Sequence, residues 1–378
     1  MKILSIGTDK NIVDKNSSVS KRAIEYGNLV DKYHVLIVGD KDIKIDLSDN
    51  VEVFSVRTEG KFKGFFDLKK RAIKLIKQNT YNLITVQDVY FLSLLALKLA
   101  KQFNLGLEIQ VHGFEKLKGI RKLIAKYVLK RADSVRTVSQ RLKKQLIEDF
   151  KVQEDKITVV PIYVEARSTN YELRSTKKGD KFIFLTVGRL VPVKNIQMQI
   201  KAIANLKDSP RIRFGEAGRF KNIELWIIGD GPERKDYELR ITHLRQGSGR
   251  QTDYELKENI KLLGYKKDLA QFYQQADCFL LTSNYEGWGM VVIEAASYGL
   301  PIIMTDVGCA GEFIKDGENG IIVPVQDQEV LEKKMEELIK NQELRLKLGN
   351  NAQESVKNLL SKEETLNLYK ESWERTIN

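Results

Sequence analysis

Apolar and polar residues alternate along this chain with two different periods. Short runs rich in Val, Ile and Leu, each about as long as a strand, are separated by segments in which apolar residues recur at helical spacing. Strands that alternate with helices are typical of a parallel sheet covered by helices. In the first half of the chain, the runs that predict strands are 2–7, 34–39, 51–56, 83–87, 107–111, 134–138 and 158–161.

The alternation stops at residues 166–180, which are polar and have no clear period, and then starts again. We therefore predict two Rossmann-like domains, 1–165 and 181–361, joined by a linker at 166–180. Residues 362–378 have helical spacing, and in paired Rossmann-like architectures such a helix can cross back to the first domain. In the second domain we expect strands at 182–187, 225–228, 260–263, 278–282, 302–305 and 320–323, and helices from about 196 to 205 and from about 290.

Residues 245–252 have the composition of a loop and lie between two similar pentapeptides, 236–240 and 253–257. This arrangement predicts a local duplication or insertion that forms an exposed helix–loop–helix. A functional lid is the alternative.

The length and composition of the chain fit two α/β domains in a reducing compartment. Its 378 residues, of which 42% are hydrophobic, are enough for two cores. The two cysteines, Cys278 and Cys309, are too few for a disulfide framework, and Cys278 falls in an apolar run. No stretch approaches the roughly 18 apolar residues of a membrane span, and the first apolar run is too short for a signal peptide. We therefore expect a cytoplasmic protein.

The net charge of +12 is confined almost entirely to the first half. Residues 1–165 contain 31 Lys and Arg against 20 Asp and Glu, whereas residues 166–378 contain 32 against 31. Two segments, 61–71 and 116–131, combine many of these cations with aromatic or apolar residues, which suits peripheral contact with an anionic membrane at its cytoplasmic face. Solvated faces of ordinary helices are the alternative. No nucleic-acid-binding module is recognisable, so we expect no nucleic-acid partner.

The segment 283–301 carries the strongest indication of function. A predicted strand ends in a loop with two glycines, and a predicted helix follows. The unpaired N–H groups and the dipole of a helix N-terminus favour an anion such as phosphate, and glycines let the backbone approach it closely. Glu286 starts the loop, and Glu294 lies about one turn into the helix. These two carboxylates can accept hydrogen bonds from sugar hydroxyls on one side and ribose hydroxyls on the other.

This segment, Glu286-Gly-Trp-Gly-Met-Val-Val-Ile-Glu294, resembles the E-x(7)-E signature of retaining glycosyltransferases of family 4, also called group 1. Arg189 and Lys194 are similar to the family's cationic pair for the donor diphosphate. The resemblance implies an α/β fold of the GT-B type, in which two Rossmann-like domains with parallel sheets face each other across a cleft. The donor-binding residues that it implies are Gly188, Arg189, Lys194, Gly229, Gly231, Gly264, Tyr265, Glu286, Gly287, Trp288, Gly289, Met290, Val291 and Glu294.

A role for Arg189 and Lys194 also makes sense without the family. Two cations near a helix start can offset the charge of a diphosphate, and arginine can do so with bidentate geometry. Such cations can replace a metal ion, and no cluster of His, Cys, Asp and Glu has convincing metal-ligand spacing, so we expect no metal and no other cofactor. The competing signal is Asp40-Lys-Asp42, because D-x-D binds Mn²⁺ or Mg²⁺ in the other large class of glycosyltransferases. Lysines in that loop would oppose a dication.

His112 follows a predicted strand and matches a family histidine that faces the donor sugar, although a structural role is the alternative. The implied catalytic residues are thus His112, Arg189, Lys194 and Glu286. Ser139 resembles another family turn but can equally be a helix N-cap. The loop 7–18 lacks the Gly-Gly pair that many members of the family have there. The resemblance therefore does not place the acceptor, and it gives no role to Lys15 or Ser18.

The implied reaction is transfer of a hexose from a UDP- or GDP-sugar to a hydroxyl of a glycan or lipid-linked acceptor, as in cell-envelope polysaccharide or glycolipid synthesis. Retention without a protein nucleophile implies a front-face route, in which the departing phosphate oxygen helps to deprotonate the acceptor and Glu286 orients the sugar. Two alternatives stay open: a GT-B relative that binds nucleotide sugars without transferring them, and a GT-B epimerase of nucleotide sugars.

Overall fold

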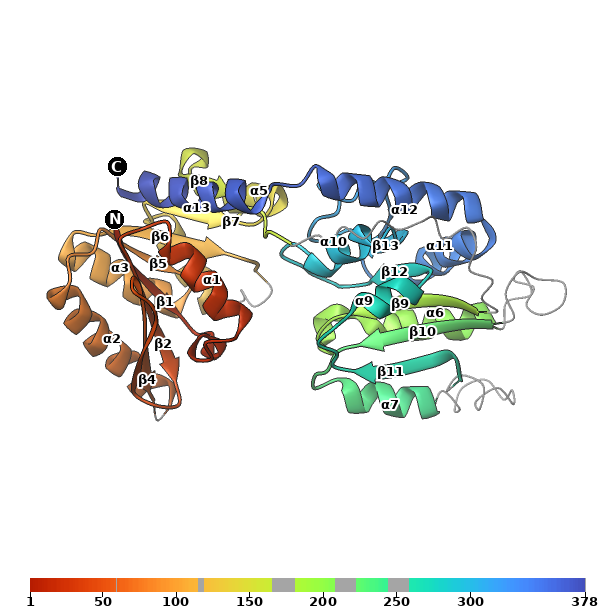
Figure 1. Cartoon of the computed structure of the whole chain (residues 1–378), viewed down its shortest axis with the longest axis horizontal. Coiled ribbons are helices and arrows are strands. Elements are labelled where there is room, and N and C mark those ends of the chain that lie inside the picture. Colours follow the sequence, from red (N-terminus) through yellow and green to blue (C-terminus); the bar gives the residue numbers. More distant parts are fainter. Residues whose placement is uncertain (59, 115–118, 165–180, 208–221, 244–257, 378) are drawn as a thin grey trace. The chain divides into compact units, whose positions relative to one another are not determined.

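The computed structural model describes residues 1–58, 60–114, 119–164, 181–207, 222–243 and 258–377. The chain forms two compact units, one of Met1–Tyr163 with Leu360–Asn378 and the other of Val164–Leu359 (Figure 1). The predicted linker 166–180 and the predicted insertion at 245–252 lie outside the described residues.

The first unit is built on an eight-stranded sheet in the order β3-β4-β2-β1-β5-β6-β7-β8. Its strand pairs are parallel, except that β3 runs antiparallel to β4. Parallel strands that are covered on both faces read as nearly continuous apolar runs, which is why most of them were predicted. The strands are β1 Lys2–Gly7, β2 Lys32–Gly39, β3 Ile43–Ser48, β4 Val51–Arg57, β5 Leu83–Val86, β6 Gly106–Val111, β7 Ser134–Thr137 and β8 Ile157–Val159.

The prediction missed β3. This strand pairs only with β4, at the edge of the sheet, and none of its six residues is buried. An edge strand in this position keeps polar residues, so it lacks the apolar run by which the other strands were recognised.

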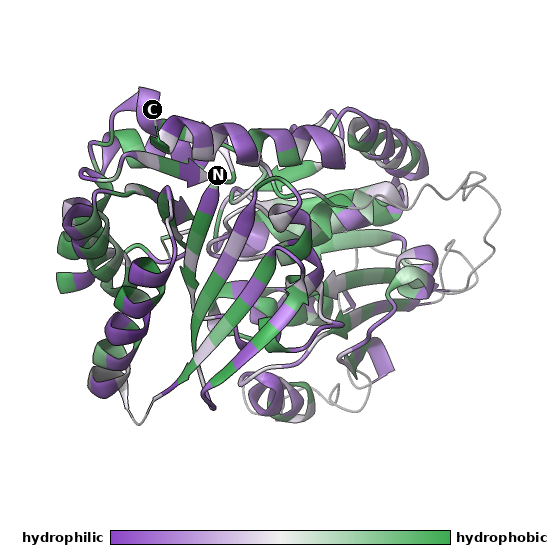
Figure 2. Ribbon diagram, turned by 60° about the vertical axis from the view of Figure 1, so that its left-hand side comes forward, coloured by the Kyte–Doolittle hydropathy of each residue, from purple (hydrophilic) through white to green (hydrophobic). Residues whose placement is uncertain are grey.

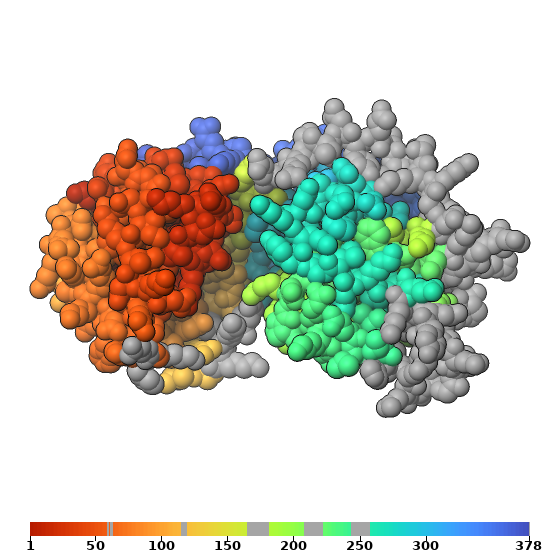
Figure 3. Space-filling model, turned by 60° about the horizontal axis from the view of Figure 1, so that its bottom comes forward, coloured from red at the N-terminus to blue at the C-terminus, as the bar shows by residue number. Residues whose placement is uncertain are grey.

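The helices of the first unit alternate hydrophilic and hydrophobic residues, as expected for helices with one side against a sheet (Figure 2). In α2, for example, Leu68, Ala72 and Leu75 are buried. The first strands with α1 and α2, red to orange in the space-filling view, form one continuous part of the surface (Figure 3). The helices are η1 Lys10–Val13, α1 Ser18–Gly27, α2 Lys61–Gln78, α3 Phe91–Phe103, α4 Ile120–Leu129, α5 Gln140–Glu148, η2 Glu154–Lys156 and α13 Lys362–Ile377.

The last helix, α13, packs on the sheet of the first unit through a buried polar network. The Glu108 carboxylate on β6 accepts hydrogen bonds from Ser372 Oγ at 2.6 Å and from Trp373 Nε1 at 3.1 Å. Arg136 on β7 pairs with the same carboxylate through two nitrogens, at 3.0 and 3.1 Å. Its guanidinium carbon lies 3.9 Å from the centre of the Tyr369 ring. These contacts join the end of the chain to the neighbouring strands β6 and β7.

The second unit has a six-stranded sheet in the order β11-β10-β9-β12-β13-β14, and its strand pairs are parallel. Both cysteines are buried in this unit, and neither is part of a disulfide. The strands are β9 Lys181–Val187, β10 Asn222–Ile228, β11 Ile260–Gly264, β12 Cys278–Leu281, β13 Ile302–Thr305 and β14 Ile321–Val323. The helices are η4 Pro192–Lys194, α6 Ile196–Lys207, α7 Arg234–His243, α9 Ala270–Gln275, α10 Met290–Ser297, α11 Gln328–Lys340 and α12 Gln342–Lys357.

Each sheet has the doubly wound order, in which successive strands first extend the sheet in one direction and then in the other. The order reverses between β1 and β5 in the first unit and between β9 and β12 in the second. Ligands of open α/β sheets bind outside the carboxyl ends of the strands at such a reversal. The loops after β9 and β12 are therefore the first place to look for a site in the second unit.

Candidate functional site

The loops that follow β9 and β12 meet at the reversal point of the second sheet. The backbone N–H of Asn284, after β12, donates to the carbonyl of Val193, after β9, at 2.7 Å. The hydroxyl of Thr282 donates to the carbonyl of Asn195 at 3.1 Å. The two segments with the most distinctive sequence in this half of the chain are thus held side by side.

Lys194 and Glu286 form an ion pair across this junction. Lys194 Nζ contacts Glu286 Oε1, and the Ser283 hydroxyl donates to the same oxygen at 2.6 Å. The side chains are 18% and 13% exposed, so the pair is sheltered but open to a ligand. Two of the residues predicted to be catalytic are therefore brought together from positions 92 apart in the chain. Ser283 was not predicted, although it is the first residue of the segment 283–301.

The helix α10 begins directly after this junction. Its N-cap is Gly289, whose φ of +102° is a conformation that glycine adopts without a steric penalty, and no side chain caps the helix. The N–H of Cys309 donates to the carbonyl of Trp288 at 2.7 Å and so joins the glycine loop to the loop after β13. An uncapped N-terminus beside a lysine provides both N–H donors and positive charge for an anion.

Glu294 lies on α10, where a buried tyrosine fixes its carboxylate. The hydroxyl of Tyr273 donates to Glu294 Oε2 at 2.9 Å, and the Tyr273 ring stacks on Tyr298 with ring centres 5.2 Å apart. Burial, with the nearby carboxylate, raises the pKa of Tyr273 well above its usual value, so its hydroxyl stays a donor. The prediction missed Tyr273, because an aromatic residue in a short helix carries no sign of a functional partner.

The other predicted donor-binding residues follow the carboxyl edge of the sheet. The N–H of Gly229, after β10, donates to the carbonyl of Gly264, at the end of β11, at 3.0 Å. A Cβ atom at Gly229 would lie 1.8 Å from the carbonyl oxygen of Gly188, so only glycine fits there. Beyond these glycines, Arg189 is exposed and Tyr265 is 76% exposed. A guanidinium and an aromatic ring are thus accessible at the same edge.

Five further predicted residues lie in the glycine loop, in the turn after β10, or in the first turn of α10. Trp288 is buried, and its Nε1 has no hydrogen-bond partner among the described residues. Its indole therefore packs inside the unit, while its backbone shapes the loop. The remaining four are half-buried: Gly287, Met290, Val291 and, after β10, Gly231.

In the first unit, His112 is exposed directly after β6, at the carboxyl edge of the sheet. Ser139 is the N-cap of α5, where its hydroxyl accepts from Leu142 N at 3.2 Å, so the N-cap alternative is confirmed. The loop 7–18 contains η1. The hydroxyl of Ser20, in α1, donates to the carbonyls of Ile12 and Asp14 and so ties the loop to that helix.

In the competing metal motif, Asp40-Lys-Asp42, both carboxylates interact with other groups of the protein. Asp40 pairs with Lys10, and Asp42 Oδ1 accepts from the backbone N–H of Arg57 at 2.9 Å. Within the described part of the chain, no group of three or more His, Cys, Asp and Glu residues could hold a metal ion. No helix there is long and apolar enough to cross a bilayer.

Two family models match this chain, one to each half. The model of glycosyltransferase family 4 matches residues 31–166, and that of glycosyl transferases group 1 matches residues 169–355, which include Lys194, Glu286 and Glu294. The chain belongs to the group 1 glycosyltransferases. The membership follows from both halves, because together the two models span most of the sequence.

Curated relatives of this glycosyltransferase match parts of it. An uncharacterized glycosyltransferase of Methanocaldococcus jannaschii is 29% identical over 67% of this chain and 59% of its own length. A lipopolysaccharide core biosynthesis glycosyltransferase of Rhizobium meliloti is 27% identical over 50% of this chain and 49% of its own. The chain thus spans about half the length of the curated relatives it matches.

Solved structures match the glycosyltransferase over nearly its whole length. A glycosyltransferase of Rickettsia africae has a TM-score of 0.75 at 19% identity, with 100% of this chain and 98% of that chain covered. HepE of Anabaena, solved in complex with UDP, has a TM-score of 0.72 at 17% identity, with 98% of both chains covered. At this identity the likeness shows the fold, which is GT-B, as the sequence predicted.

Proposed function

We propose that this glycosyltransferase is a retaining, metal-independent hexosyltransferase that uses a UDP- or GDP-sugar as donor. The observation that carries the proposal is the Lys194–Glu286 pair at the reversal point of the second sheet, beside the uncapped N-terminus of α10. HepE, a protein of the same fold, was solved with UDP and with UDP-glucose, which supports a nucleotide-sugar donor.

In this proposal the donor diphosphate lies against Arg189, Lys194 and the first N–H groups of α10. These groups carry positive charge or partial charge, so they stabilise the diphosphate as it leaves and take over the work of a dication. Glu294 accepts hydrogen bonds from the ribose hydroxyls, and the Tyr273 hydroxyl keeps its carboxylate oriented. Glu286 accepts from the hydroxyls of the transferred sugar.

Transfer then proceeds on one face of the sugar. The bond between the anomeric carbon and the phosphate oxygen breaks, and its electron pair leaves with the diphosphate. The acceptor hydroxyl oxygen bonds to the same face of the anomeric carbon, and its proton passes to the departing phosphate oxygen. Glu286 orients the sugar and attacks nothing, and His112, directly after β6 of the first sheet, keeps the catalytic role that the family resemblance implies.

The acceptor in this proposal is a glycan or a lipid-linked sugar at the cytoplasmic face of a membrane. The supporting observation is an apolar stripe on α4, where Ile120, Leu123 and Tyr127 are 69%, 69% and 46% exposed. The same helix carries Arg121, Lys122 and Lys126, all exposed. Apolar side chains flanked by cations suit an anionic bilayer surface, where each cation contributes on the order of 1 kcal/mol.

The donor proposal is tested by thermal unfolding with a panel of nucleotides. UDP, GDP and their hexose conjugates are added to the wild type and to Arg189→Ala, whose side chain is exposed and so tolerates removal. We expect one base to stabilise the wild type and the effect to shrink in the variant. Equal stabilisation of both proteins, or none by any nucleotide, would reject the site.

The membrane proposal is tested by co-sedimentation with phosphatidylglycerol vesicles. We expect the double variant with Ile120→Ser and Leu123→Ser to bind these vesicles much less than the wild type. The matched control is Leu239→Ser, which replaces an exposed apolar residue of α7 and should leave vesicle binding unchanged. If the wild type does not bind these vesicles at low salt, the acceptor is a soluble one.

A further inference from the structure

A pocket of about 640 Å³ lies in the first unit between the edge strand β3, its neighbour β4 and the helix α2. Its volume is that of a small-molecule site. The strands β2, β1 and β5 separate β4 from β6, so the pocket lies roughly 19 Å along the sheet from the strand that precedes His112. Its lining includes none of the residues proposed for sugar transfer.

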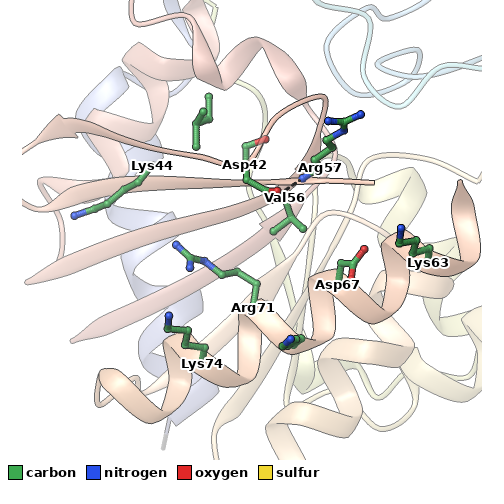
Figure 4. Close-up of a pocket in the computed structure, with 11 residues that line it drawn as sticks. Asp42, Lys44, Val56, Arg57, Lys63, Asp67, Arg71 and Lys74 are labelled. Carbon is green, nitrogen blue, oxygen red and sulfur yellow. Dashed lines mark hydrogen bonds between the residues drawn. The ribbon is translucent and has the colours of Figure 1, made fainter. Parts of the chain in front are cut away.

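The lining of this pocket is strongly cationic (Figure 4). Six cationic side chains and two carboxylates, those of Asp42 and Asp67, line it. The Asp42 carboxylate has a hydrogen-bond partner, because its Oδ1 accepts from the backbone N–H of Arg57. The cations are Lys44, Arg57, Lys63, Lys70, Arg71 and Lys74.

Four of these cations form a stripe on α2. Lys63, Lys70, Arg71 and Lys74 lie at spacings of seven, one and three, which places them on one face of the helix. Like charges at this spacing repel each other and destabilise a helix slightly. In the part of the chain that the structure describes, neither Lys70 nor Lys74 forms an ion pair. An anion in the pocket would relieve this repulsion.

The wall of β4 holds two of the cations in place. The guanidinium carbon of Arg71 lies 5.0 Å from the centre of the Phe54 ring, and Lys44 Nζ lies 5.9 Å from it. Stacking on an aromatic ring orients a guanidinium, so less freedom is lost when a ligand binds. Lys44 is partly neutralised by Asp46 and Glu52, at 3.3 and 3.0 Å. Arg71 with Lys70 and Lys74 is thus the strongest anion-binding group.

We infer that this pocket binds a multiply charged phosphate group. A guanidinium matches phosphate oxygens with two parallel hydrogen bonds, and flanking lysines add point charges. The phosphate is carried either by the headgroup of a membrane lipid or by a soluble molecule. The inference does not rest on sugar transfer, and its test measures binding alone.

The test is titration calorimetry with inorganic pyrophosphate. All proteins carry Arg189→Gln, which removes the exposed arginine of the proposed donor site in the second unit. In this background we compare two double variants. The pocket variant carries Lys70→Gln and Lys74→Gln together. The matched control carries Lys69→Gln and Lys77→Gln, which remove two charges from the same helix outside the pocket. Lys70 and Lys74 are exposed, so their loss does not disturb folding.

We expect the dissociation constant to rise about tenfold or more in the pocket variant and less than about twofold in the control. Equal changes in both, or no pyrophosphate binding in the parent, would overturn the inference. Vesicles that contain phosphatidic acid, whose phosphate monoester is multiply charged, then identify the source of the phosphate. A loss of vesicle binding specific to the pocket variant assigns it to a lipid headgroup, and equal vesicle binding by pocket variant and control assigns it to a soluble molecule.

Discussion

Each unit contains an ion pair between residues of neighbouring strands or of the loops that follow them, and the two pairs differ in almost every respect. Glu108 and Arg136 are 0% and 4% exposed, and hydroxyl and indole donors complete the hydrogen bonding of the carboxylate. Burial tends to raise the pKa of Glu108, but Arg136 and these donors hold it below its usual value. Lys194 and Glu286 are sheltered only in part, beside an uncapped helix.

The difference shows what each pair can do. A buried pair with satisfied partners cannot exchange them for a ligand, so Glu108 and Arg136 hold α13 on the sheet. A pair that a ligand can reach is able to exchange partners, so a diphosphate can compete for Lys194 and a sugar for Glu286. Both sheets are doubly wound, and the chemistry depends on which strand ends carry accessible charges.

The largest expected effect is on stability, at the buried pair. Glu108→Gln leaves the Arg136 charge uncompensated in the core, and breaking a buried pair in this way costs about 3–5 kcal/mol. Urea unfolding of the full chain measures the cost. Glu286→Gln serves as the control and should change stability by less than about 1 kcal/mol. Similar losses in both variants would mean that the pairs do not differ in kind.

The next effect is on turnover, at the accessible pair. Glu286→Gln removes the carboxylate that orients the sugar, and we expect kcat to fall about 100-fold or more. Binding of the nucleoside diphosphate should stay as tight as in the wild type or become tighter, because Lys194 loses its competing partner. Steady-state kinetics and calorimetry separate the two. Weaker binding of the nucleoside diphosphate with an unchanged kcat would mean that Glu286 contacts the nucleotide and not the sugar.

A smaller effect is expected at Glu294. Its removal deletes hydrogen bonds to the ribose, so Glu294→Ala should weaken nucleoside diphosphate binding about tenfold. The control is Tyr273→Phe, which keeps the carboxylate but removes the hydroxyl that orients it and should have a milder effect. If Glu294→Ala binds the nucleotide as tightly as the wild type, the ribose assignment is wrong.

The smallest expected effect is that of a chelator. Because Arg189, Lys194 and α10 stabilise the leaving diphosphate in this proposal, activity in EDTA should match activity in buffer. Assays with and without added Mn²⁺ measure this. Activity that is lost in EDTA and restored by Mn²⁺ would bring back Asp40 and Asp42 as metal ligands.

The sequence was sufficient for features that depend on local pattern. Buried parallel strands have continuous apolar runs, so the core strands were predicted. The family resemblance pointed to Glu286, Glu294, Arg189 and Lys194 as candidate site residues, and their roles stay predictions. Features that depend on distant partners were out of reach. The Glu108 network joins residues 264 and 265 positions apart, and Tyr273 acquires its partner only when α9 packs beside α10. The edge strand β3 lacks the apolar run that marks a core strand.

The central claim is that the second unit's site transfers a hexose with retention, and the most direct measurement is donor cleavage followed by NMR. UDP- and GDP-linked hexoses are incubated with the wild type and with Glu286→Gln, and the first sugar released is observed before its anomers equilibrate. We predict that the wild type releases nucleoside diphosphate and a sugar with the anomeric configuration of the donor, and that the variant releases almost none. Release of the opposite anomer, equal release by the variant, or no cleavage of any hexose donor would contradict the account.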